Sequence, residues 1–217
     1  MKKILLLFGT MALATLIASP ASAGIVYDNL FGNGNFNVAG WNVTTGIFSA
    51  ADSFVLGSSA TIDGVQLAFW TYPNDTVSSI NWSFQQDDGA DPLLGSIIES
   101  GTANSPLEIA QFPNSTDYFN ISIETFSIPA LLLDANTTYW LQISANTQNA
   151  FGLFWDESDG PSLGYHSAMG SIPSESFQLL GNSPVQSFDS DPVPEPGTFA
   201  LVGGMLMAAA ALRRRKP

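Results

Sequence analysis

Apolar and polar side chains alternate with a period of two in four stretches of the chain, residues 65–72, 80–84, 119–124 and 139–143. Successive side chains of a β-strand point to opposite faces, so each stretch predicts a strand with one apolar face. The expected apolar faces are Val65, Leu67 and Phe69; Ile80, Trp82 and Phe84; Phe119, Ile121 and Ile123; and Tyr139, Leu141 and Ile143.

Turn-forming pairs such as Asp63-Gly64 and Asp88-Gly89 separate these segments, and no sustained helical apolar period occurs between them. Further strands are expected near Phe54 and within residues 97–98, 151–155 and 176–180. Many short strands at this spacing predict an all-β fold, an antiparallel β-sandwich of jelly-roll type. The length of the body fits one extracellular domain, which we place at residues 24–192.

Basic residues occur only at the two ends of the chain: Lys2, Lys3, Arg213, Arg214, Arg215 and Lys216. The 19 acidic residues all lie between them. Basic residues beside apolar stretches mark the segments that stay in the cytoplasm, so this pattern predicts an exported middle. A body without lysine or arginine cannot neutralise phosphate groups, which excludes nucleic acid as a partner.

Residues 1–23 have the layout of a secretory signal peptide. An apolar core at residues 4–17 follows the two lysines, and Ala21, Ser22 and Ala23 supply the small residues that a signal peptidase accepts. The apolar run is shorter than the about 20 residues of a membrane-spanning helix, which disfavours a permanent anchor. Cleavage after Ala23 makes Gly24 the expected mature N-terminus.

Residues 193–217 combine a proline-flanked tripeptide, an apolar run and a basic end. Pro194, Glu195 and Pro196 are expected to stay extended and accessible, because proline interrupts regular structure. The apolar run at residues 199–212 would form a helix of about 21 Å, shorter than a hydrocarbon core of about 30 Å. We expect one short transmembrane helix that holds the chain transiently, with Arg213 to Lys216 as a cytoplasmic stop.

This order of tripeptide, short helix and basic tail resembles the sorting signal of the PEP-CTERM proteins, and each part is present without departure. The resemblance covers about the last 25 residues and implies a Gram-negative bacterium. It also implies an exosortase as processing partner and passage through the inner membrane. The final location would be the cell surface or the exopolysaccharide matrix.

The body carries a looser resemblance, in residues 53–57, 60–67 and 132–141, to the β-sandwich domains that precede several bacterial surface anchors. This resemblance implies a surface domain and supplies no catalytic residues.

Two acidic turn segments, residues 87–91 and 156–160, hold the hard oxygen ligands that Ca²⁺ prefers. Neither segment matches the EF-hand pattern. We expect Asp156, Glu157 and Asp159 as the better candidate site for a structural Ca²⁺, because the apolar run before them could hold it rigid. The alternative is a solvated acidic turn without metal.

Trp70, Tyr72 and Trp140, with Gln142 beside them, form a candidate sugar-binding surface. Flat aromatic rings next to amide groups suit carbohydrate stacking and hydroxyl recognition. The alternative is that these rings belong to the core, since alternation does not say which face is buried.

The chemistry of the body favours a non-enzymatic protein. It has no cysteine, the single histidine is His166, and no Gly-x-Ser-x-Gly motif surrounds a serine. Abundant carboxylates leave a secreted jelly-roll glycan-active enzyme as the alternative. We therefore expect an exported surface or matrix protein, with carbohydrate binding as its candidate role.

Overall fold

The computed structural model describes residues 24–30, 39–89, 95–113 and 118–182. All described residues belong to one compact unit within residues 1–184. The signal-peptide residues Ala21 and Ala23, the tripeptide at 194–196, the predicted helix and the basic cluster all lie outside the described residues. Gly24, the expected mature N-terminus, is the first residue of the first strand.

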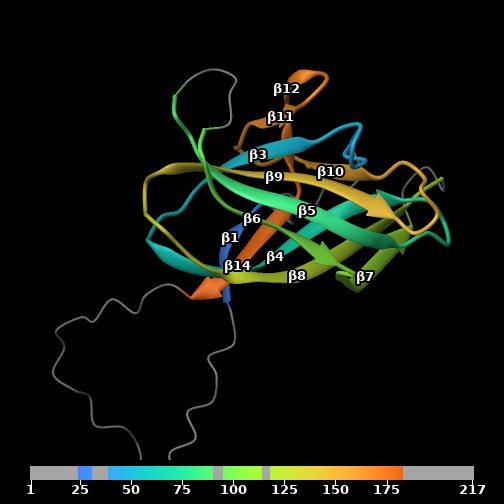
Figure 1. The fold of residues 1–217 in the computed structure, drawn as a ribbon, viewed down its shortest axis with the longest axis horizontal. Coiled ribbons are helices and arrows are strands. Elements are labelled where there is room, and N and C mark those ends of the chain that lie inside the picture. Colours follow the sequence, from blue (N-terminus) through green and yellow to red (C-terminus); the bar gives the residue numbers. More distant parts are fainter. Residues whose placement is uncertain (1–23, 31–38, 90–94, 114–117, 183–217) are drawn as a thin grey trace, which may run out of the picture. The chain divides into compact units, whose positions relative to one another are not determined.

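The described part of the chain contains fourteen strands and no helix (Figure 1). The strands are β1 (Gly24–Asp28), β2 (Gly40–Asn42), β3 (Ala50–Val55), β4 (Ala60–Thr71), β5 (Val77–Gln86), β6 (Ile97–Asn104), β7 (Leu107–Pro113), β8 (Asn120–Leu133), β9 (Thr138–Thr147), β10 (Phe154–Ser158), β11 (Gly164–His166), β12 (Gly170–Ile172), β13 (Ser174–Glu175) and β14 (Phe177–Asn182). They form two antiparallel sheets, which confirms the predicted all-β, sandwich-like architecture. The jelly-roll connectivity stays a prediction.

The first sheet is organised around the long strand β4. On one side β4 pairs with β8, which in turn pairs with β7. On its other side β4 pairs first with β14 and then, beyond Leu67, with β10. β1 extends the sheet from β14, and β2 and β13 both pair with β10. The second sheet has the order β12-β11-β3-β9-β5-β6.

Alternation along the central strands builds the core between the sheets. The expected faces of β4, β5 and β9 are buried in one apolar cluster, together with Phe54, Trp155 and Phe177. These three predicted faces are confirmed. Ile121 and Ile123 also share a face. They pack with Leu30 and Ala68 in a second, smaller cluster, on the face of the sheet opposite to Leu67 and Phe69. Burial of both clusters provides the main driving force for folding.

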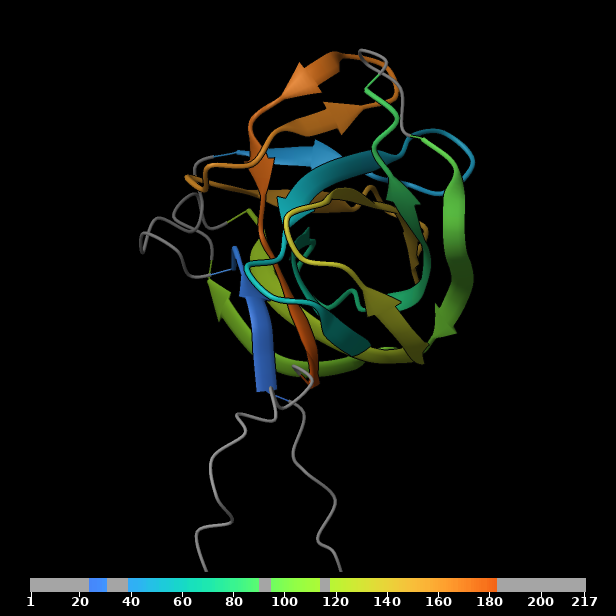
Figure 2. The same ribbon diagram turned by 90° about the vertical axis from the view of Figure 1, so that its left-hand side faces the viewer.

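The two ends of the described body lie together. Gly24 at the start of β1 pairs with Gly181 near the end of β14, and Figure 2 shows these ends side by side. Thr61, at the start of β4, pairs with Asn182. Since a strand rises about 3.3 Å per residue, the far end of β4 lies roughly 30 Å from the chain ends.

Candidate functional site

Trp70 and Tyr72 lie at that far end of β4 and belong to a group of contacting rings. This aromatic cluster consists of Trp70, Tyr72, Phe119, Phe151 and Phe154. Ring centroids are 4.9 Å apart for Tyr72 and Phe119, and 5.4 Å apart for Tyr72 and Phe151. Tyr72 is 37% exposed and Phe151 is 53% exposed. The cluster therefore presents apolar ring surface to solvent.

Trp140 and Gln142 lie on β9, in the other sheet. The Trp140 Nε1 atom is buried without a partner in the described part of the chain. Gln142 accepts a hydrogen bond from the Gln85 side chain at 2.7 Å and donates one to Ser49 Oγ at 3.1 Å. The four residues of the candidate sugar surface are thus divided between two sheets, and Phe119 and Phe151 join Trp70 and Tyr72 instead.

The candidate calcium residues lie in three different environments. Asp156 is wholly buried and accepts hydrogen bonds from Trp70 Nε1 and from Ser176 Oγ. Glu157, its neighbour on β10, accepts one from Trp41 Nε1 at 3.2 Å, and Asp159 is exposed. Among the residues that the structure describes, no three or more Asp, Glu or His side chains are arranged as metal ligands.

A buried acid pair, Asp52 and Glu175, was not identified from the sequence. Asp52 on β3 and Glu175 on β13 are both completely buried. The Asp52 Oδ2 atom accepts hydrogen bonds from the Glu175 backbone amide at 2.5 Å and from Ser162 Oγ and Ser174 Oγ at 3.1 Å each. The hydrogen bond from the Glu175 backbone amide to the Asp52 carboxylate joins the two sheets at this point.

The remaining oxygens of the acid pair are Asp52 Oδ1 and the two carboxylate oxygens of Glu175. Within the described ranges, Asp52 Oδ1 and both carboxylate oxygens of Glu175 are buried without a hydrogen bond. Burial raises the pKa of Asp52 to about 7. Burial, together with the charges of Asp52, Asp156 and Glu157, raises the pKa of Glu175 well above its usual value. Asp52 lies on the same inward face of β3 as Ala50 and Phe54. An acid at such a position is the sequence signal that could have revealed Asp52.

Glu108 and Glu124 form a second pair of carboxylates, on paired positions of β7 and β8. The Ser122 hydroxyl lies 2.9 Å from Glu108 Oε2 and 2.6 Å from Glu124 Oε1, so it bridges the two groups. Glu124 is buried and Glu108 is exposed. Burial raises the pKa of Glu124 to about 7, and the charge of Glu108 adds to this effect.

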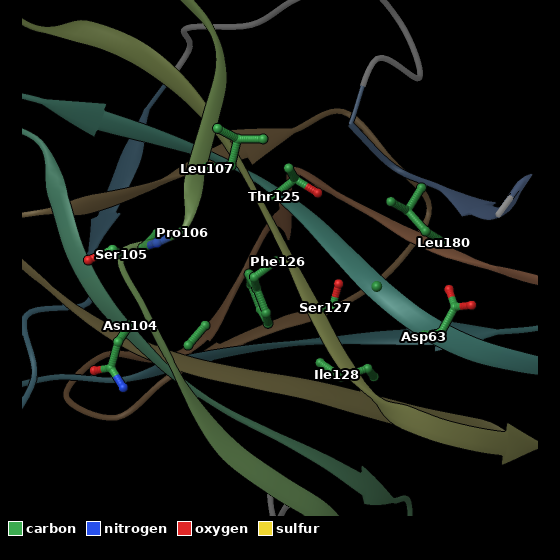
Figure 3. A pocket seen from close by; sticks show the side chains of 12 residues that line it. Asp63, Asn104, Ser105, Pro106, Leu107, Thr125, Phe126, Ser127, Ile128 and Leu180 are labelled. Carbon is green, nitrogen blue, oxygen red and sulfur yellow. The ribbon is translucent and has the colours of Figure 1, made fainter. Parts of the chain in front are cut away.

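A hollow of about 730 Å³ lies where the chain passes from β6 to β7. Figure 3 shows Asn104, Ser105 and Pro106 on one side, Asp63 and Leu180 on the other, and β8 residues between them. Asp63 is the single carboxylate among its described lining residues. Glycoside hydrolysis by the usual route needs two carboxylates, so this hollow offers a binding surface without that catalytic pair.

His166 occupies a structural position on β11. Its Nε2 atom lies 2.8 Å from the Asn42 carbonyl oxygen, and its ring stacks between Trp41 and Phe48. In the part of the chain that the structure describes, no hydrogen bond joins this ring to a serine or a carboxylate.

Comparison with known proteins adds no family to this picture. Neither the scan against protein-family models nor the search of curated proteins found a match. Within the described ranges, no helix is long and apolar enough to cross a membrane. The site and its geometry therefore carry the functional argument.

Proposed function

We propose that this chain is a non-enzymatic exported protein of the cell surface or exopolysaccharide matrix of a Gram-negative bacterium. Its C-terminal signal directs it to an exosortase at the inner membrane, and its β-sandwich-like body binds glycan through the aromatic cluster. The observation that carries the binding role is the position of Tyr72 and Phe151, partly exposed at the end of the body opposite the chain ends.

The composition of the aromatic cluster supports a glycan ligand. Tyr72 and Phe151 offer ring surface to the apolar C–H face of a sugar, while nearby amide groups can bind hydroxyls. The Asn149 side chain supplies such an amide and is held in place by Asp75 Oδ1 at 3.2 Å. The absence of lysine and arginine from the body favours a neutral glycan over a strongly anionic one.

Polysaccharide co-sedimentation tests the binding role. Replacing Tyr72 and Phe151 together by alanine should lower retention on the producing cell's exopolysaccharide about tenfold or more. The loss of each ring should cost roughly 1 kcal/mol of binding free energy. The matched control is Ile97→Ala, which removes an exposed apolar side chain from the other sheet. Equal retention of the double variant and the parent protein would exclude the aromatic cluster as the binding surface.

Mass spectrometry of the surface protein tests the sorting role. Glu195→Ala with both flanking prolines replaced should leave the chain uncut in the inner membrane. Replacing Arg213, Arg214 and Arg215 by neutral residues should let the tail pass through the inner membrane or insert in the wrong orientation. If the parent protein at the cell surface still carries residues beyond Gly197, the C-terminal segment is a plain single-pass anchor and not a sorting signal.

The alternative function, a secreted glycan-active enzyme, is favoured by one observation. Glu108 and Glu124 both contact the Ser122 hydroxyl, and two neighbouring carboxyl groups, one with a raised pKa, are the kind of groups that glycoside hydrolysis needs as acid and base or nucleophile. Release of reducing sugar from a glycan, abolished by Glu124→Gln and by Glu108→Gln, would establish this alternative. If the glycan stays uncleaved, the enzyme alternative is excluded and the binding role is retained.

A further inference from the structure

Among the described residues, the buried acid pair has no lysine or arginine to compensate its charge. The body contains no lysine or arginine, and its one histidine is bonded to the Asn42 carbonyl oxygen. Asp156 and Glu157 add further negative charge near Glu175. A buried carboxylate without a partner is strongly unfavourable, and proteins normally pair such groups or use them to bind a metal.

We propose that Asp52 and Glu175 bind one Ca²⁺ ion between the two sheets. The Asp52 Oδ1 atom and both oxygens of Glu175 supply three acceptors that have no hydrogen bond within the described ranges. Two carboxylates and additional neutral oxygens make a site of the hard type that calcium prefers. This inference does not depend on the proposed glycan role.

Neutral oxygens lie beside the Asp52 carboxylate, and a calcium ion would need such groups, or water, to complete its coordination. The hydroxyls of Ser162 and Ser174 both donate to the other oxygen of Asp52, which fixes the orientation of that carboxylate. The Asn29 side chain donates to Ser174 Oγ and to the Glu175 carbonyl oxygen at 2.7 Å, so it holds β13 in place. These contacts fix the Asp52 carboxylate and the β13 backbone, and they do not use Asp52 Oδ1 or the Glu175 carboxylate oxygens.

One residue of a surface turn contacts the buried pair. Ser162 belongs to the exposed turn at residues 159–163 and is itself half-exposed, yet its hydroxyl reaches Asp52. The preference for Ca²⁺ over Mg²⁺ follows from geometry, since Mg²⁺ requires near-ideal octahedral coordination and gives up its water reluctantly.

Calorimetry and thermal unfolding of the exported protein, first stripped with a chelator, test the proposal with calcium chloride alone. Titration should show one bound Ca²⁺ per chain. At a calcium concentration 100 times the dissociation constant, the melting temperature should rise by about 5–10 °C. Magnesium at the same concentration should give a much smaller rise.

Paired variants locate the ion. Asp52→Asn and Glu175→Gln should each abolish the calcium-dependent rise, whereas Asp159→Asn in the surface turn and Glu124→Gln in the other carboxylate pair should keep it. Glu175→Gln removes a buried charge with little change of shape, so the calcium-free variant should melt no lower than the calcium-free parent.

Two results would overturn the proposal. If the stripped parent protein binds no calcium and melts at the same temperature with or without it, protons neutralise the acid pair. If Asp159→Asn abolishes the response while Asp52→Asn and Glu175→Gln keep it, the metal lies at the exposed turn.

Discussion

At the scale of single residues, Glu124 should make stability depend on pH. Its pKa is raised from 4.5 in the unfolded chain to about 7 in the folded protein, so the folded state holds a proton that the unfolded state releases. Its contribution is therefore fully present below pH 4.5 and is lost as the pH rises through 7. Compared with the parent protein, Glu124→Gln should gain about 3 kcal/mol more stability at pH 8 than at pH 4.

Urea unfolding at several pH values measures this difference between the parent protein and Glu124→Gln. The control is Glu99→Gln on β6, an acid on an edge strand, which should follow the parent curve. Parallel curves for the parent and Glu124→Gln would show that Glu124 is ionised in the folded state.

The alternation pattern predicts the orientation of apolar residues well and that of polar residues poorly. Val65, Leu67 and Phe69 point into the core as expected, because an apolar face has only one favourable direction. Asp52 shares the inward face of β3 with Ala50 and Phe54, but the backbone and hydroxyl donors that hold it lie on β13 and in the 159–163 turn, and no local pattern predicts them. The acid pair is a product of tertiary structure and could not be found from one segment.

At the scale of strands, β1 should depend on the packing of Tyr27. Its ring lies 5.5 Å from that of Phe54 and 5.1 Å from that of Phe177, so it connects the edge strand to the core. Tyr27→Ala should lower the free energy of unfolding by about 2–3 kcal/mol, somewhat less than for a fully buried ring.

The matched control for this prediction is Ile25→Ala on the same strand. Ile25 is 57% exposed, so its loss should change stability by no more than about 0.5 kcal/mol. Chemical unfolding of both variants provides the measurement. Equal effects at the two positions would mean that β1 is held by its backbone hydrogen bonds with β14 alone.

The long strands were predictable and the short ones were not. Strands such as β4 and β9 are long enough for alternation to repeat, and they were expected at the right place. β11, β12 and β13 have only two or three residues each, so no period can be established in them. β11 pairs with β3 and β13 with β10, so their formation depends on strands that do not adjoin them in the sequence.

At the scale of the whole molecule, the charge distribution predicts resistance to trypsin. Trypsin cleaves after lysine and arginine, and every such residue lies within the first 3 or after residue 212. If both ends are removed, as we propose, the remaining body should stay intact even when denatured. Intact mass after exhaustive digestion in urea checks this, and any internal fragment would show that an end has been retained.

The pairing of β4 with β14 also has a mechanical consequence. A glycan held at Tyr72 would pull β4 toward one end of the body, while an attachment through the chain beyond Asn182 would pull β14 toward the other. The hydrogen bonds between antiparallel strands run perpendicular to the strands, so this load is a shear that the ladder from Thr61 to Leu67 shares. Loaded in this direction, the bonds must break together instead of one after another, so the body would resist tension applied between these two points.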